Sequence, residues 1–300
     1  MIYKNPKSKQ INRFDLVYKK MKPNIPKFPY YVDIELTNNC NCNCKMCPRT
    51  ISQRKTGYMS ETLFKKIVDE CEVSRTPIRL IGFGEPLLHP QFKNFITYAL
   101  SKKYIKVHLT TNGRLLDWKT IETLVNWKVH SIIISFQGLT KEEYQNMRGC
   151  SWDVVEENLK VFKRQRGRKN KPYIRITTTI DSIDEKDRQS FLKQWLPLVD
   201  SISIGKTNWH IVNQKEPDYQ NYVQCSEVNR LVQVSWDGKV SPCCGDPDDF
   251  LTIGNANDES IRTIWKKSKR LECIRELLKD KGNKTLNPCF KCVPTYQEFD

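Results

Sequence analysis

The stretch "YYVDIELTNNCNCNCKMC" (residues 30–47) joins a strand-like run to four closely spaced cysteines. Residues 30–36 are rich in Tyr, Val and Ile, a composition typical of β-strands. The cysteines follow at positions 40, 42, 44 and 47, so they belong to the loop after this strand. Parallel α/β folds place their chemistry in the loops at the carboxyl ends of strands. The stretch therefore predicts a site at the end of the first strand of such a fold.

Five further strand-like segments alternate with helical segments. The strands are expected at 78–83, 105–111, 131–136, 173–180 and 201–204. Apolar residues recur at helical spacing from Ser60 and Pro90, and again near 118–127, 151–165 and 184–196. Six strands with five helical segments between them predict a parallel sheet with helices on its outer face.

The pattern changes after about residue 210. Asp237-Gly238, between two short strand-like runs, predicts a two-residue hairpin turn in which both residues have positive φ. One helix is expected over 258–279. The chain is thus predicted to comprise a basic leader (1–29), an α/β unit (30–209) and a small α+β unit (210–300).

Composition limits the class of protein. With 300 residues, 38% hydrophobic and 28% charged, the sequence is that of a globular protein. It shows no signal peptide and no apolar run long enough for a membrane span, so we expect a cytoplasmic protein with no membrane partner. Clustered cysteines in a reducing compartment are more often metal or cluster ligands than disulfides.

The net charge of +16 is concentrated in two places. Residues 1–28 contain eight Lys or Arg against Asp15, and residues 163–175 contain seven cations and no acid. Such runs are either a nucleic-acid footprint or a solvated, lysine-rich surface. Aromatic residues are not interleaved with these cations as stacking platforms would be, so nucleic acid is not an expected partner.

The spacing of the first cysteines favours an iron-sulfur cluster over zinc. Structural zinc usually takes two separated pairs of ligands, whereas these thiols are two, two and three positions apart with no His nearby. Thiolates that bind a cluster are spread over separate irons. Cys40, Cys44 and Cys47 form the pattern C-x3-C-x2-C.

This C-x3-C-x2-C pattern resembles the cluster motif of the radical SAM superfamily. The resemblance implies that Cys40, Cys44 and Cys47 hold a [4Fe-4S] cluster, and that Cys42 is not a ligand. It also implies that the open iron binds S-adenosyl-L-methionine, which is cleaved to a 5'-deoxyadenosyl radical that abstracts hydrogen from substrate. A flavodoxin- or ferredoxin-type protein is then the expected electron donor.

Further segments resemble the same family in order along a partial (β/α)6 barrel. They are "GFGEP" (82–86), "TTNG" (110–113) and "SFQG" (135–138), in which Gln137 replaces the family's acidic residue. The resemblance implies a cofactor-binding set that comprises Met46, Gly82, Gly84, Glu85, Pro86, Thr111, Asn112 and Ser135.

The last cysteines resemble the SPASM or twitch extension of this superfamily. Cys225, Cys243, Cys289 and Cys292 form C-x17-C...C-x2-C, and the resemblance selects Cys243 rather than Cys244. It implies a second, auxiliary [4Fe-4S] cluster with complete thiolate ligation. A structural zinc site with the same four cysteines is the alternative, because C-x2-C is also a zinc spacing.

Three functions remain open at this point. Size and cysteine layout resemble family members that oxidise a sugar, cyclitol or other small alcohol, including phosphorylated or nucleotide-linked substrates. The alternatives are an epimerase or peptide- or protein-modifying enzyme, and a nucleic-acid-modifying protein. Candidate catalytic residues are Lys206 and Arg175, at or just after strands, and Cys150, a potential hydrogen-atom donor. Solvated charge and core packing are the alternative roles for these three residues.

Two clusters predict about eight irons per chain after anaerobic reconstitution. A variant with Cys40, Cys44 and Cys47 all changed to Ala should retain about half of that iron, because the C-terminal thiols are untouched. Iron analysis and visible absorbance check this expectation. Protein that takes up zinc alone, without cluster absorbance, would contradict it.

Overall fold

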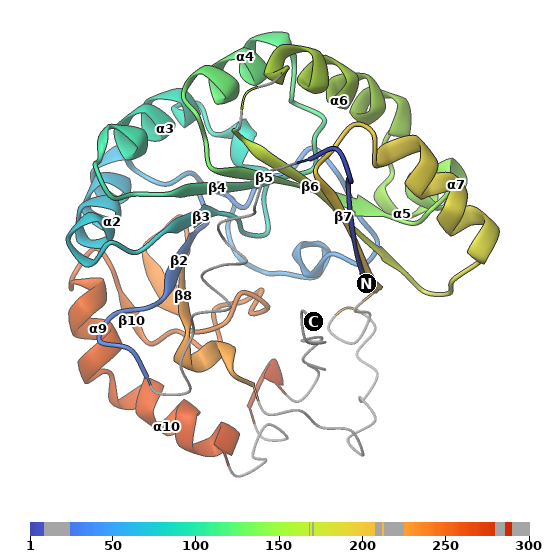
Figure 1. Cartoon of the computed structure of the whole chain (residues 1–300). Coiled ribbons are helices and arrows are strands. Elements are labelled where there is room, and N and C mark those ends of the chain that lie inside the picture. The colour runs from blue at the N-terminus through green and yellow to red at the C-terminus, as the bar shows by residue number, and fades with distance from the viewer. Residues whose placement is uncertain are drawn as a thin grey trace.

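One curved sheet organises the chain, with helices along its outer side (Figure 1). The computed structural model describes residues 1–8, 25–167, 169, 171–207, 212, 225–279 and 286–289. Within these ranges the strands form a single ten-stranded sheet in the order β1-β7-β6-β5-β4-β3-β2-β8-β9-β10.

The middle of the sheet is the predicted parallel barrel. Its strands are β2 (Tyr31–Ile34), β3 (Ile78–Leu80), β4 (Val107–Thr111), β5 (Ser131–Gln137), β6 (Tyr173–Ile180) and β7 (Ser201–Lys206). Each pairs in parallel with the next in sequence. The prediction of a partial (β/α)6 barrel is confirmed.

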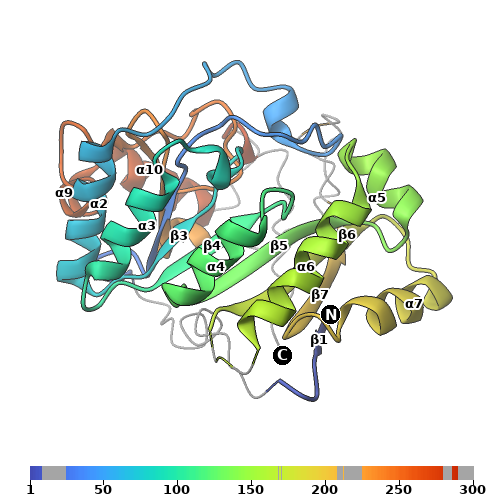
Figure 2. The same cartoon turned by 90° about the horizontal axis from the view of Figure 1, so that it is seen from above.

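The outer helices are α2 (Glu61–Ser74), α3 (Phe92–Ser101), α4 (Trp118–Asn126), α5 (Lys141–Arg148), α6 (Trp152–Arg166) and α7 (Glu185–Trp195), seen from above in Figure 2. The Ser60 side chain accepts a hydrogen bond from the backbone N–H of Leu63 and so begins α2 as predicted. Helix α5 was not predicted. A capping box formed by Thr140 and Glu143 begins it, and Gly149 ends it in the left-handed conformation.

Side chains alternate between the two faces of the barrel strands. Val32 and Ile34 are fully buried in the hydrophobic core. The opposite face is polar: Asp33 forms an ion pair of 2.5 Å with Arg79, and Arg175 Nε donates to Ser201 Oγ at 2.9 Å. The barrel therefore has an apolar layer between sheet and helices and a polar lumen.

The two edges of the barrel are extended by segments distant in sequence. In the leader, β1 (Ile2–Lys4) pairs antiparallel with β7. On the other side β8 (Leu231–Val234) pairs in parallel with β2, so the C-terminal unit continues the barrel sheet. Neither pairing was predicted. The proposed division at 209/210 lies outside the described residues.

The hairpin between β8 and β9 (Lys239–Ser241) differs from the prediction of a two-residue turn. Ser235 N donates to Lys239 O at 2.9 Å, which closes a three-residue loop. Only Gly238 has positive φ, at 93°, whereas Asp237 does not. A three-residue loop needs a single left-handed residue, so glycine is required only there. The last strand, β10 (Gly254–Asn255), pairs with β9.

The helix predicted over 258–279 is two helices, α9 (Ile261–Lys267) and α10 (Lys269–Lys279). Ser268 between them has extended backbone. Its hydroxyl donates to Ile253 O at 2.8 Å and accepts from Leu271 N at 3.3 Å. The serine thus ends one helix and begins the next, which apolar periodicity alone does not reveal.

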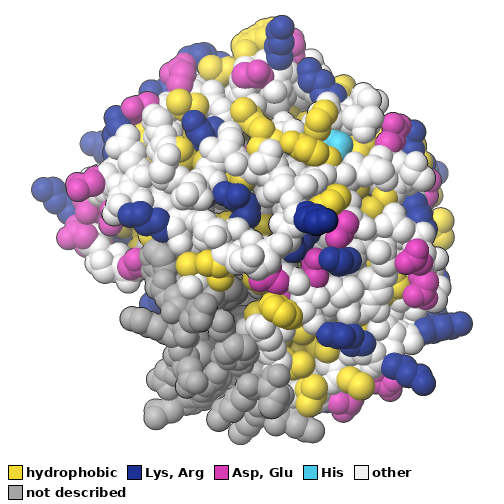
Figure 3. All heavy atoms as spheres, turned by 180° about the vertical axis from the view of Figure 1, so that it is seen from behind, with side chains coloured by type: hydrophobic (Ala, Val, Ile, Leu, Met, Phe, Trp, Pro, Cys, Tyr) yellow, Lys and Arg dark blue, Asp and Glu magenta, His cyan; other side chains and the backbone are white. Residues whose placement is uncertain are grey.

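The surface mixes charges of both signs. Lys and Arg are interspersed with Asp and Glu on the face shown in Figure 3. None of the helices in the described ranges has the length and apolar content needed to cross a membrane.

An aromatic cluster behind β5 should contribute strongly to stability. Phe136 is 1% exposed, and its ring centroid lies 4.4 to 5.0 Å from those of Tyr144, Trp152 and Trp195. Phe136→Ala should lower the free energy of unfolding by about 3–5 kcal/mol. The matched surface change Val154→Ala should alter it by less than about 0.5 kcal/mol. Denaturant titration measures both, and equal effects would contradict this assignment.

Candidate cofactor-binding site

A cavity of about 280 Å³ lies at the carboxyl ends of β2 to β6. It brings together most of the predicted cluster and cofactor residues, namely Cys40, Cys44, Met46, Cys47, Gly82, Gly84, Glu85, Thr111, Asn112 and Ser135. Pro86 is absent from its lining and begins the short 3-10 helix Pro86–Leu88. The sequence-predicted set therefore converges on one place.

The cysteine loop lies directly against the glycine-rich segment. A Cβ on Gly84 would fall 2.1 Å from Thr37 O and 2.6 Å from Asn39 O. Glu85 N donates to Asn39 O at 2.8 Å. Only a residue without a side chain permits this approach, so Gly84 is required by the position of the cysteine loop.

Glu85 joins the ends of two strands. Its buried carboxylate accepts hydrogen bonds from Thr111 Oγ1 at 2.8 Å, Asn112 N at 2.7 Å and Leu87 N at 3.2 Å. Burial raises the pKa of Glu85 to about 7, against the hydrogen bonds that favour its charged form. These hydrogen bonds hold the ends of β3 and β4 together.

Asn112 continues this network to the cysteine loop. Its Nδ2 donates to Asn41 Oδ1 at 2.6 Å and lies 3.9 Å from Cys40 Sγ. Arg114 donates to Asn41 O at 2.6 Å. The end of β4 therefore fixes the first half of the cysteine loop.

Cys42 contacts a cysteine from outside the cysteine loop. Its Sγ lies 3.2 Å from Cys150 Sγ, which belongs to the turn between α5 and α6. Lys45 N also donates to the carbonyl oxygen of Met147, in the last turn of α5, at 2.9 Å, so α5 and the turn that follows it both contact the cysteine loop.

The residues present fit a thiolate-bound cluster with S-adenosyl-L-methionine. Three half-buried thiols in C-x3-C-x2-C order share one cavity with a glycine cradle and a buried carboxylate. Within the described ranges, no three His, Cys, Asp or Glu side chains are grouped to hold a single metal ion. A cubane cluster does not need such a group, because its thiolates bind separate irons.

The three predicted catalytic residues do not line this cavity. Arg175 is buried near the start of β6, at the opposite end of the lumen. Lys206 is exposed at the end of β7, where it pairs with Ile180. Cys150 packs against the core beside Cys42. Their catalytic roles stay predictions.

Two arginines were missed by the sequence analysis. Arg148 lines the cavity and is 5% exposed. Arg54 forms ion pairs with Glu35 at 2.6 Å and Asp249 at 3.2 Å, and so links the cysteine loop to the C-terminal unit. An Arg at the end of a helix, followed by Gly, is the only local signal for Arg148, and nothing local marks Arg54.

The C-terminal cysteines are described in part. Cys225, Cys243 and Cys289 are half-buried and pack against the hydrophobic core, whereas Cys244 is exposed. Gly245 N donates to Cys243 Sγ at 3.2 Å. Cys292 lies outside the described residues.

Comparison with known proteins gives two family matches. The model of the radical SAM superfamily matches residues 34–193. The model of the SPASM iron-sulfur cluster-binding domain matches residues 225–293.

Similar proteins act on different kinds of molecule. The S-adenosyl-L-methionine-dependent 2-deoxy-scyllo-inosamine dehydrogenase of Niallia circulans is 22% identical, over 90% of this chain and 96% of that protein. The antilisterial bacteriocin subtilosin biosynthesis protein AlbA of Bacillus subtilis is 31% identical, over 79% of this chain and 59% of that protein. The crystal structure of BtrN with AdoMet and 2-DOIA has a TM-score of 0.60 at 17% identity, over 90% of this chain and 97% of that chain.

Single substitutions should separate the ligands from their neighbour. Cys44→Ala should abolish reductive cleavage of S-adenosyl-L-methionine, because the cluster loses a thiolate. Cys42→Ala should leave cleavage largely intact, since Cys42 lies outside the C-x3-C-x2-C pattern although its thiol lines the same cavity and also contacts Cys150. Cys150→Ala is the matched control for loss of that contact. Release of 5'-deoxyadenosine measures cleavage, and equal losses in the Cys42 and Cys44 variants would show that the ligand set is wrong.

Proposed function

The chain belongs to the radical SAM superfamily and carries a SPASM domain, and on this premise we propose that it oxidises an alcohol of a small polyhydroxylated substrate. The substrate class is a sugar, cyclitol or related metabolite. The observation that carries the proposal is the polarity of the lumen next to the cofactor cavity.

The chain's own residues hold and orient the cofactor. Cys40, Cys44 and Cys47 would bind the first cluster, and the Gly82 to Glu85 segment would receive the methionine end of S-adenosyl-L-methionine. When bound, this pair supplies a 5'-deoxyadenosyl radical that takes a hydrogen atom from an unactivated C–H bond. The buried Glu85 carboxylate is an acceptor for an ammonium group at that position.

Hydroxyl and amide groups face the cavity from β5 and β6. They are Ser135, Gln137, Thr177 and Thr179. Thr179 Oγ1 donates to Gln137 Oε1 at 2.9 Å, so two of these four side chains already hydrogen-bond each other. Such groups both donate and accept, which matches the hydroxyls of a polyol. An apolar substrate would offer no hydrogen bond to the Ser135 and Thr177 hydroxyls, at a cost of about 1–3 kcal/mol for each hydroxyl that it buries without a partner.

The extent of the similarity supports a small-molecule substrate. This chain spans 96% of the dehydrogenase but 59% of the bacteriocin biosynthesis protein. The matched region of this chain therefore has the size of an enzyme that acts on an aminocyclitol.

Oxidation of the carbinol requires loss of the hydrogen atom, the hydroxyl proton and one further electron. A second cluster would supply the electron acceptor when bound. Its ligands would be Cys225, Cys243, Cys289 and Cys292. We propose Lys206 as the cation that favours the developing alkoxide, since it lies at the same end of the barrel as the cavity.

Peptide modification is the second candidate. The similarity to the bacteriocin biosynthesis protein, at 31% identity over 79% of this chain, favours it.

An epimerase would differ from the proposed dehydrogenase, because hydrogen returns to the substrate carbon and no net oxidation occurs.

Isotope transfer tests the proposed reaction. With 2-deoxy-scyllo-inosamine deuterated at its carbinol carbons, about one deuterium per turnover should appear in 5'-deoxyadenosine, and the ketone should form. Cys289→Ala should still cleave S-adenosyl-L-methionine but form no ketone, because the electron acceptor is lost. Mass spectrometry measures both products. A product with one solvent hydrogen and no oxidation would favour the epimerase, and Cys150→Ala would then be the next variant.

A further inference from the structure

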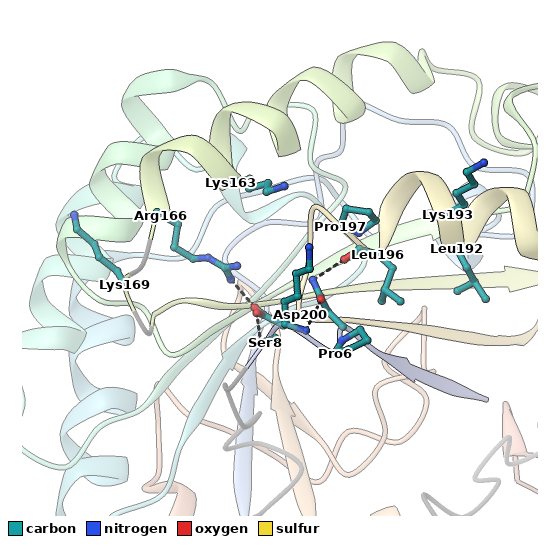
Figure 4. Close-up of a pocket in the computed structure, with 13 residues that line it drawn as sticks. Pro6, Ser8, Lys163, Arg166, Lys169, Leu192, Lys193, Leu196, Pro197 and Asp200 are labelled. Carbon is teal, nitrogen blue, oxygen red and sulfur yellow. Dashed lines mark hydrogen bonds and ion pairs between the residues drawn. The ribbon is translucent and has the colours of Figure 1, made fainter.

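A second cavity of about 890 Å³ lies at the other end of the barrel, where β6 and β7 begin (Figure 4). Three segments enclose it: residues 5–8 after β1, the end of α6 with the turn that follows, and the connection from α7 to β7. It shares no lining residue with the cofactor cavity. The proposed reaction does not use it.

Hydrogen bonds and an ion pair connect the residues on the floor of this cavity. The Asp200 carboxylate, 2% exposed, accepts hydrogen bonds from Arg166 at 2.5 Å, Ser8 Oγ at 2.6 Å and Ile174 N at 2.7 Å. Asn5 Nδ2 donates to two carbonyl oxygens of the α7–β7 connection, both at 2.9 Å. The Asp200 charge is therefore neutralised by Arg166, and these bonds hold the three segments together.

The rim of the cavity is strongly basic. Lys7, Lys163, Lys169 and Lys193 line it, and all four are exposed. Asp200 is the only acid among the described lining residues, and it is paired with Arg166. Lys7, Lys163 and Lys193 form no ion pair with any residue that the structure describes. Like charges around one hollow repel each other, and a bound anion would relieve this repulsion.

The walls between these lysines are aliphatic, formed by Pro6, Leu192, Leu196 and Pro197 (Figure 4). The volume lies within the range of pockets that bind small molecules. None of the described lining residues is aromatic, so none of them would stack on a nucleic-acid base. Lysines bind phosphate as point charges, and a cluster of them suits a ligand with several negative charges.

We propose that this cavity binds a multiply phosphorylated small molecule, such as a nucleotide or sugar polyphosphate. Its phosphates would lie between Lys7, Lys163 and Lys193, and its carbon skeleton against the aliphatic walls. Because the ligand would contact the N-terminal segment, α6 and α7 together, it would also stabilise the edge of the barrel.

Two of the lysines have an alternative structural role that the experiment must separate. Lys163 and Lys193 lie in the last turns of α6 and α7, where cations stabilise a helix through its dipole. Lys266 and Lys267 lie in the last turn of α9, outside the cavity, and serve as matched controls.

Calorimetric titration of the reconstituted full-length protein tests the site. Tripolyphosphate and ATP are the probes, in separate arms, at about 0.1 M ionic strength with S-adenosyl-L-methionine saturating the other cavity. We expect one site per chain. Lys163→Gln/Lys193→Gln should weaken binding about tenfold or more, which is about 1.4 kcal/mol or more, because two of the cations that would contact the phosphates are lost.

The controls decide the interpretation. Lys266→Gln/Lys267→Gln should leave the Kd for tripolyphosphate and for ATP unchanged. Both double variants remove two cations from helix C-terminal turns, so we expect them to lower the melting temperature by similar amounts. Tighter binding of ATP than of tripolyphosphate would identify a nucleotide ligand, and equal binding a polyphosphate group alone. The proposal is overturned if neither probe binds at about 1 mM, if the control double variant loses as much affinity, or if only RNA oligonucleotides bind.

Discussion

The site depends on one backbone contact, the approach of Gly84 to the carbonyl oxygens of Thr37 and Asn39. This contact brings the loop after β2 against the loop after β3, so that the thiols and the glycine-rich segment share a cavity. Glu85 then extends the arrangement to β4 through Thr111 and Asn112. Because these bonds run between strand ends, the parallel sheet itself sets the positions of the cysteines.

The polar lumen is the second consequence of the parallel sheet. Its charges are paired, as in Asp33 with Arg79, because unpaired buried charges would cost several kcal/mol. The outer face of the same strands supplies the hydrophobic core that offsets this cost. The polarity of this lumen supports the proposal of a hydroxylated substrate in the adjoining cavity.

The C-terminal unit is joined to the barrel by main-chain and ionic contacts. Strand β8 continues the sheet beyond β2, and Arg54 connects Glu35 of the barrel to Asp249. The side chains of Glu35 and Asp249 are almost fully buried, so their ion pairs are little screened by solvent. Cys243, which follows β9 of this unit, is therefore held in a fixed relation to the cysteine loop.

Local patterns in the sequence were sufficient for the parallel barrel and for the convergence of the predicted cluster and cofactor segments at one end of it. Strand and helix periodicity is a local property, and the motifs lie at strand ends that a parallel sheet must bring to one edge. The Cys40, Gly84 and Asn112 segments thus converge whatever the details of packing.

Other features depended on tertiary contacts between distant segments. The pairing of β1 with β7 and of β8 with β2, the contact of Cys42 with Cys150, and the basic cavity around Asp200 each join residues more than 100 positions apart. Lys206 and Arg175 were selected for their positions on strands, but pleat direction and depth in the barrel decide what their side chains contact. The sequence alone determined the chemistry at the ends of the strands, because that chemistry follows from local order. The tertiary structure decided which distant surfaces meet, because packing between them is not encoded in any single local pattern.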